Sequence, residues 1–107
     1  MPLYLVQASY SPQATAAMIK SPQDRAAAMR PVIKRMGGKL VGMWFAFGEF
    51  DVVAIVEVPD NISAAALSMA IGAKGSVSAF RTTPLLSTAD AVAAMKKARG
   101  AGYQPPK

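Results

Sequence analysis

Residues 42–58 read GMWFAFGEFDVVAIVEV, and this stretch predicts two strands, about 39–47 and 51–58, around a polar break. A strand that buries only one face should alternate apolar and polar residues, but both faces of each strand here are apolar. A small antiparallel sheet with two apolar faces needs two covers, and we expect helices on one face and a second copy of the sheet on the other. The first strand carries Val41, Met43, Phe45 and Phe47 on one face and Leu40, Gly42, Trp44 and Ala46 on the other; the second carries Val53 and Ile55 opposite Val52, Ala54, Val56 and Val58.

The composition is apolar for a chain of this size. The 107 residues predict one domain, and they are 52% hydrophobic and 17% charged. Soluble domains average about 25% charged residues. An excess of apolar surface on a small protein is typical of an interface, so the composition also favours a homodimer or higher homo-oligomer.

The absence of both cysteine and histidine removes several kinds of chemistry. It excludes disulfides, thiolate nucleophiles, the usual zinc sites and histidine acid–base catalysis, so no metal and no cofactor is expected. The N-terminal residues Met1 to Leu5 do not resemble a signal peptide, and no run of about 18 apolar residues predicts a membrane helix. A cytoplasmic location without a membrane partner is the expectation.

The net charge of +6 raises the question of a nucleic-acid partner. Lys96, Lys97 and Arg99 fall in the last turn of a predicted helix, where cations complement the helix macrodipole. The other cations are scattered, and no basic run is interleaved with aromatic residues. The pattern therefore disfavours nucleic acid and other polyanions as partners.

Helix-start signals divide the first third of the chain. Residues 2–10 predict a strand, and Ser11-Pro12 starts a helix that ends near Lys20. Ser21-Pro22 repeats the signal before a second helix that ends at Gly37-Gly38. Pro31 predicts a kink or break within that helix. Its core-facing stripe is Met29, Val32, Ile33 and Met36.

The rest of the chain completes a ferredoxin-like pattern. It predicts a helix at about 62–73 capped by Pro59-Asp60-Asn61, a strand at 76–83, and a last helix to Arg99 with Val92 and Met95 turned inward. The order βαββαβ plus a helix predicts a four-stranded antiparallel sheet with helices on one face. Residues 1–99 form the single domain of this prediction, and residues 100–107 form an extended tail.

Several segments resemble the GYD-domain family of small bacterial and archaeal proteins. The name-giving pattern is Gly, an aromatic residue and Asp, and here Phe50 stands where the family has tyrosine. The resemblance implies a ferredoxin-like fold and a dimeric α+β barrel, and it implies no settled biochemical activity. The matching segments are Leu3 to Val6, Arg30 to Ile33, Gly37 to Leu40, Gly48-Glu49-Phe50-Asp51, Pro59 to Asn61, and Thr82 to Leu86.

The hairpin motif has a structural and a functional interpretation. Gly48 allows a positive φ in a tight loop, and Asp51 can accept hydrogen bonds from nearby backbone N–H groups, which favours the structural one. In the functional interpretation Asp51 lies at the mouth of the barrel as a base or as a partner of a cationic group.

Five further residues are candidates for a binding site. Glu57 and Arg81 lie in otherwise apolar strands, where an unpaired charge is costly to bury. In the structural interpretation, one or both lie at an exposed strand end or edge. In the functional interpretation, Arg81 faces an internal cavity and binds a carboxylate or phosphate. Gln7 and Tyr10 add polar groups to the first strand, and Trp44 is typical of a core or an interface.

Three functions remain open from the sequence. The first is a non-enzymatic module for small-molecule binding or assembly. The second is a cofactor-free enzyme of the dimeric-barrel type, such as a monooxygenase, isomerase or dehydratase acting on a small apolar substrate, with Asp51, Glu57, Arg81 and Tyr10 as its actors. The third is a polyanion-binding protein.

Overall fold

The computed structural model describes all of residues 1–107 and has the predicted ferredoxin-like order. Its four strands form one antiparallel sheet in the order β2-β3-β1-β4, which places β1 and β3 at the centre. The elements are β1 (Leu3–Tyr10), α1 (Pro12–Lys20), α2 (Arg25–Arg35), β2 (Lys39–Phe45), β3 (Val52–Glu57), α3 (Asn61–Gly72), β4 (Val77–Leu85) and α4 (Thr88–Arg99).

A short polar side chain caps the start of each helix. Ser11, Asp24, Asp60 and Ser87 each accept a hydrogen bond from a backbone N–H in the first turn, which satisfies donors that have no partner inside the helix. The start of α2 predicted at Ser21-Pro22 is wrong, because that helix begins at Arg25 with Asp24 as its cap. At the other end of α2, Gly37 has a φ of 82°. This left-handed residue lets the chain turn directly into β2.

Helix α2 is continuous through Pro31, so the predicted break is absent. A proline in a helix removes the hydrogen bond to the carbonyl four residues earlier, here that of Ala27. Both Ala27 and Pro31 are exposed, so water can satisfy the freed carbonyl. The missing bond therefore costs less here than it would on a buried helix face.

The strands divide their side chains between two faces of the sheet. In β1 the even-numbered residues Tyr4, Val6 and Ala8 are buried, whereas Leu5 and Gln7 are half-buried. Strand β3 repeats the pattern with Val52, Ala54 and Val56 buried. We call the buried side the helix face and the opposite side the open face. The open face is formed by Leu3, Leu5, Gln7 and Ser9 of β1, Lys39, Gly42 and Trp44 of β2, Val53, Ile55 and Glu57 of β3, and Ala79, Arg81, Thr83 and Leu85 of β4.

A bulge in β2 corrects the predicted facing of one residue. The register with β3 shifts between Leu40 and Gly42, so Val41 is an extra residue without its own partner. Leu40 consequently lies on the helix face, where it is buried opposite Val56, rather than on the face of Trp44.

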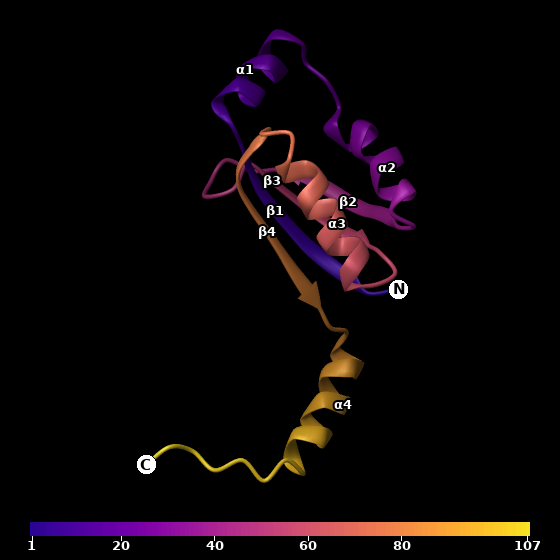
Figure 1. Cartoon of the computed structure of the whole chain (residues 1–107), viewed down its shortest axis with the longest axis vertical. Coiled ribbons are helices and arrows are strands. Elements are labelled where there is room, and N and C mark those ends of the chain that lie inside the picture. The colour runs from indigo at the N-terminus through magenta and orange to yellow at the C-terminus, as the bar shows by residue number, and fades with distance from the viewer.

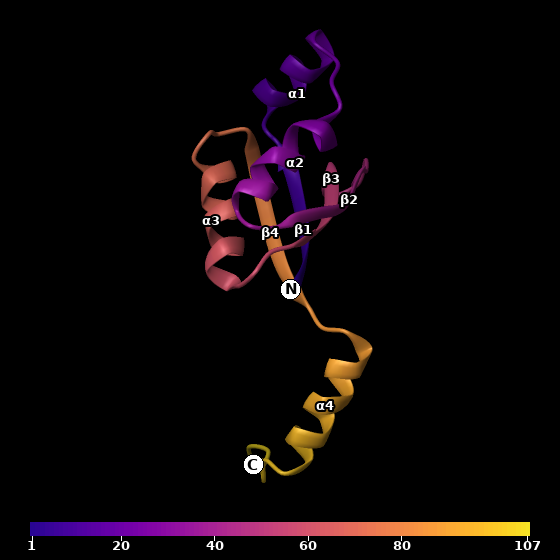
Figure 2. The same ribbon diagram turned by 90° about the vertical axis from the view of Figure 1, so that its right-hand side faces the viewer.

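Two helices cover the helix face, and they stand over opposite edges of the sheet (Figure 2). Helix α2 packs on β2 and helix α3 packs on β4, so the central strands lie beneath the space between them. A hydrogen bond of 2.6 Å from the Tyr4 hydroxyl to Asn61 Oδ1 fixes the start of α3 to the central strand. The two helices thus act as walls over a floor made by β1 and β3.

Helix α4 leaves the domain altogether (Figure 1). Val92 is 47% exposed and Met95 is 67% exposed, so the prediction that they point inward is wrong for the single chain. The molecule is consequently 57 Å long in its largest dimension and 22 Å in its smallest. None of the helices has the length and hydrophobicity that crossing a bilayer requires.

Candidate functional site

A large hollow lies on the helix face, between α2 and α3. We call it the helix-side cleft; its volume is about 490 Å³. The cleft results from the positions of its two helical walls, because α2 packs along one edge strand and α3 along the other. Sixteen of its 19 lining residues are hydrophobic, which makes it a site for an apolar molecule.

Small residues in the central strands deepen the cleft. Ala8 and Ala54 belong to its floor and alternate there with Val6 and Val52. A larger side chain at either alanine would rise into the space between the helices. The walls are formed by Met29, Val32 and Ile33 of α2 and by Leu67, Ala70 and Ile71 of α3.

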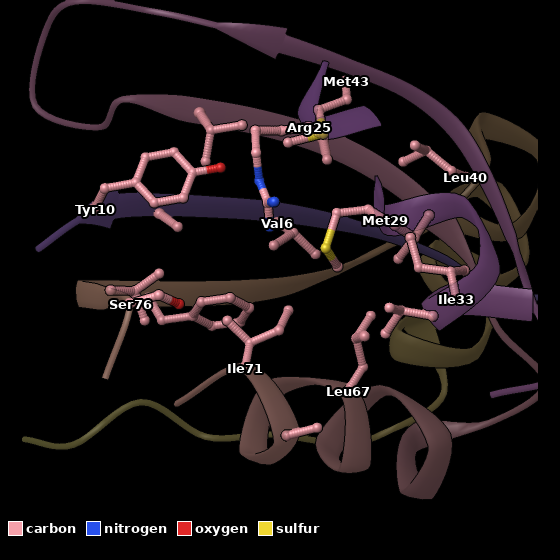
Figure 3. A pocket seen from close by; sticks show the side chains of 18 of the residues that line it. Val6, Tyr10, Arg25, Met29, Ile33, Leu40, Met43, Leu67, Ile71 and Ser76 are labelled. Carbon is pink, nitrogen blue, oxygen red and sulfur yellow. The ribbon is translucent and has the colours of Figure 1, made fainter. Parts of the chain in front are cut away.

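The polar groups of the cleft gather toward one end (Figure 3). Tyr10, at the end of β1, directs its hydroxyl toward the side of the cleft where Arg25 extends from α2, and Ser76 lies near them. Lys74 also lines the cleft, two residues before Ser76 in the chain. No carboxylate is among the lining residues, so the fixed charges of the cleft are positive. Tyr10 is thus the single candidate from the sequence that lines this cleft.

Asp51 lies in the β2–β3 hairpin and binds backbone. Its Oδ2 atom accepts a hydrogen bond of 2.9 Å from the Tyr10 N–H, and its own N–H donates to the Ala8 carbonyl at 2.9 Å. The β1–β4 register shifts between Ser9 and Tyr10, so the carboxylate satisfies an N–H at an irregular point of the central strand. This geometry favours the structural interpretation of Asp51.

The rest of the hairpin motif supports the same attachment. Ser9 donates its hydroxyl hydrogen to the Glu49 carbonyl at 3.0 Å. Gly48 does not have a positive φ, so the conformational reason given for a glycine there is wrong. The space around its Cα is open, with nothing within 4 Å of the position a Cβ would take. Phe50 lies under the guanidinium of Arg81, whose carbon is 5.3 Å from the ring centroid, an arrangement that favours a cation–π interaction.

The remaining candidates lie on the open face. Arg81 is exposed there and pairs in register with Gln7 of the neighbouring strand. Glu57 lies between Leu3 and Lys39 in the register of the sheet. These residues therefore do not reach the helix-side cleft, and no group of three acidic side chains lies close enough to hold a metal ion.

Trp44 is the largest side chain of the open face and is 57% exposed. Its ring lies over Gly42, because a Cβ built on that glycine would meet the ring carbons. The absence of a side chain at Gly42 thus allows the indole ring to pack directly against the backbone of β2. Trp44 and the half-buried Val53 and Ile55 give this face its apolar character.

The sequence interpretation missed the two cations of the cleft. Arg25 and Lys74 looked like scattered surface charges, since nothing in their spacing relates them to each other. The signal that could have revealed the cleft is the pair Ala8 and Ala54, two small residues in strands otherwise rich in larger apolar ones. Small residues at the centre of a sheet leave room beneath the helices that cross it.

Comparisons with known proteins agree with this fold. A structure described as "crystal structure of FFRP-DM1" resembles the chain with a TM-score of 0.53 at 11% sequence identity, covering 80% of this chain and 100% of that one. At this identity the similarity concerns the fold alone. No curated protein matches the sequence. The family model of the GYD domain matches residues 4–95, which include the sheet, its covering helices and the first two turns of α4. The chain therefore belongs to the GYD-domain family.

Proposed function

We propose that the protein is a non-enzymatic module that binds a small, largely apolar molecule in the helix-side cleft. We also propose that it works as a homodimer joined through the open face of its sheet. The observation that carries the binding proposal is the cleft itself, an apolar hollow of about 490 Å³ with a few polar groups at one end. Ligand pockets of roughly 300–1,000 Å³ with this distribution of polar groups are the usual form of small-molecule sites.

Packing energetics support an occupant for the cleft. Protein interiors are packed about as densely as organic crystals, and side chains that border an empty space lose their dispersion contacts there. Met29, Val32 and Ile71 pack against the hydrophobic core, line the cleft and are only half-buried. A bound apolar molecule would restore the missing contacts of these three residues, and that gain would drive its binding.

The homodimer is supported by the open face. The half-buried Leu5, Val53 and Ile55 lie at its centre, and Trp44 stands beside them. An antiparallel sheet can leave one face in water when that face is polar, but the centre of this face is apolar. A second copy, placed face to face, would cover the same residues on both chains.

The positions of the acidic residues do not favour the enzyme alternative. An enzyme acting on a molecule in the cleft would need its acid or base there, yet Asp51 and Glu57 are not among the lining residues. Asp51 is engaged with the Tyr10 backbone, and Glu57 lies on the opposite face. Of the four residues considered as actors, Tyr10 alone could touch the bound molecule.

The binding proposal is tested by filling the cleft. Ala70→Phe places a ring at a lining position of α3, and Ala65→Phe, an exposed position of the same helix outside the cleft, is its control. The neutral fluorescent probe N-phenylnaphthylamine should bind the original protein and the control, and Ala70→Phe should weaken binding about tenfold or more, as expected when roughly 1.4 kcal/mol of contact is lost. Equal binding by all three proteins would refute the cleft as the site.

The homodimer is tested by placing a charge on the open face. Ile55→Lys introduces an unpaired cation at the centre of that face, and Ile62→Lys is its control at a position of α3 that is already 81% exposed. Sedimentation should show a dimer for the original protein and for Ile62→Lys, and a monomer for Ile55→Lys. A stable monomer of the original protein at micromolar concentration would end this proposal.

A further inference from the structure

We propose that the molecule held in the helix-side cleft is an amphipathic anion, with an apolar body and one carboxylate or similar head group. This inference rests on the proposed binding function and names the chemical class of its ligand. The apolar body would lie between α2 and α3, and the head group would meet Arg25, Tyr10 and Ser76 at the polar end (Figure 3).

A second hollow continues the cleft at its polar end. It has a volume of about 170 Å³ and shares Tyr10, Arg25 and Ser76 with the cleft. Gln23 adds an amide to its lining. Arg25 and Tyr10 therefore stand at the junction of a large apolar hollow and a smaller, more polar one. That junction is where the head group of an amphipathic molecule would leave its apolar surroundings while its charge stays solvated.

The guanidinium of Arg25 is not neutralised by its contact in the structure. Its Nη1 atom donates a hydrogen bond of 2.8 Å to Oε1 of Gln23, a neutral amide. The remaining N–H groups of the guanidinium form a planar fork that matches a carboxylate. A carboxylate at this point would gain charge-assisted hydrogen bonds without meeting a competing acid from the cleft lining.

The position of Arg25 in its helix argues for a role beyond helix stability. It is the first residue of α2, where the macrodipole is positive and a cation is unfavourable. Asp24 is the nearest acid in the chain, and its Oδ1 atom accepts hydrogen bonds from the N–H groups of Ala26 and Ala27. The carboxylate of Asp24 is thus occupied by capping the helix. The cation of Arg25 therefore adds to the positive potential at the polar end of the cleft.

The presence of a cation at Lys74 can be explained without a ligand, and the test must distinguish the two explanations. It follows the end of α3, where a cation complements the macrodipole without any ligand. We therefore assign the head group primarily to Arg25, with Lys74 as a second positive charge near the same end. Substitution of Lys74 alone would not distinguish helix stability from binding, so Arg25 carries the experiment.

The experiment compares three probes that share a ten-carbon chain and differ in the head group: decanoate, decanol and decylammonium. Titration calorimetry below the micelle concentration should show decanoate binding about tenfold or more tightly than decanol, since a hydrogen bond to a charged group is worth roughly that factor. Decylammonium should bind most weakly. In Arg25→Met the preference for decanoate over decanol should disappear, while decanol keeps its affinity because the apolar lining is unchanged.

Arg30→Met is the matched control. Arg30 lies on the same helix, is exposed and does not line either hollow, so its loss changes the net charge equally without touching the cleft. Arg30→Met should keep the full preference for decanoate. An equal loss in both variants would mean that overall charge, and not a site at Arg25, selects the anion, and this would overturn the inference.

Other outcomes separate this inference from the binding proposal. If N-phenylnaphthylamine binds in the cleft but decanoate and decanol bind equally, the binding function stands and the anionic head group is wrong. If decanoate dissociates the dimer in sedimentation, an apolar segment of the partner copy fills the cleft, and the ligand assignment fails. Unchanged sedimentation with bound decanoate is the expected result.

Discussion

The centres of the two faces of the sheet are built from similar apolar residues, but they lie in different environments. Val56, on the helix face, is 2% exposed, whereas Trp44, on the open face, is 57% exposed. The difference does not come from hydrophobicity alone, because the centre of the open face is also apolar; it comes from which face the chain's own helices reach. Even the covered face is only partly filled, since α2 and α3 stand apart over the central strands. Apolar character therefore shows that a cover is needed, and topology decides what supplies it.

The sharpest contrast between the faces concerns two glycines of the β2 region. At Gly38 a Cβ would collide with the Glu57 carbonyl oxygen and the Val58 side chain, which are backbone and buried core. Gly38→Ala should therefore lower the free energy of unfolding by about 3 kcal/mol, the upper part of the usual range for overpacking. Chemical denaturation measures this value.

Gly42 is the matched position for that experiment. Its Cβ would meet the ring of Trp44, a side chain on the open face that can swing away. Gly42→Ala should cost less than about 1 kcal/mol in the monomer and should shift the tryptophan emission. Equal losses at the two glycines would show that the open face is as rigidly packed as the helix face, against our description.

The next effect compares two valines of β3. Val56→Ala removes two methyl groups from the core and should cost about 2 kcal/mol through lost burial and the cavity left behind. Val53→Ala lies on the open face, where the side chain is half-buried, and should cost less than about 1 kcal/mol in dilute protein. If a second copy covers this face, the cost of Val53→Ala should grow with protein concentration, because unfolding is then linked to dissociation.

A smaller effect concerns Asp51, which joins the hairpin to the central strand. Asp51→Asn weakens the acceptor for the Tyr10 N–H and should lower stability by about 1 kcal/mol, the net value of one charge-assisted hydrogen bond with partial replacement by the amide. Glu49→Gln is the control, since Glu49 is exposed and its backbone carbonyl is what accepts from Ser9. If instead Asp51→Asn leaves stability unchanged and abolishes binding of a cationic ligand, the functional interpretation of this residue is restored.

The smallest effect is a pH dependence at the start of α3. Hydrogen bonds from the Ser63 backbone N–H, and then from its side chain, hold the pKa of Asp60 below its ordinary value. A carboxylate with a depressed pKa stabilises the fold fully above its unfolded-state pKa of about 3.9, and this contribution is lost as the pH falls through the lower folded-state pKa.

The test at Asp60 is the stability difference between the original protein and Asp60→Ala. This difference should be constant near neutral pH and should shrink in acid below about pH 4, where the carboxyl becomes protonated in both states. Because the side chain is fully exposed, the change should be modest and should diminish with added salt. A difference that increases in acid would contradict the assigned direction.

The order of elements and the two apolar faces could be predicted because they depend on local signals. Ser11, Asp60 and Ser87 mark helix starts through their own side chains, and Gly37 marks a helix end through its positive φ. The period of two in β1 and β3 assigned each residue to the correct face. Such signals act over three or four residues and need no knowledge of the tertiary structure.

The features that escaped prediction depend on distant parts of the chain. The bulge at Val41 is set by pairing with β3, and the continuity of α2 at Pro31 depends on whether water reaches the Ala27 carbonyl. The cleft depends on how far apart two helices stand over a shared floor, so Arg25 and Tyr10 come together from elements with no common pattern in the sequence. Most of the candidates chosen from the strands, such as Gln7, Glu57 and Arg81, therefore lie on the open face and do not line that cleft.

The separation of α4 from the domain has a consequence for its own persistence. A helix of three turns that is not packed against the rest of the domain is marginal in water, because nucleation is costly and few bonds follow it. Its capping by Ser87 and the cations of its last turn slow fraying but do not protect its amides from solvent. In a lone chain these amide hydrogens should therefore exchange with deuterium almost as fast as in an open peptide. Slow exchange along residues 88–99 would be the mark of a neighbour lying against them.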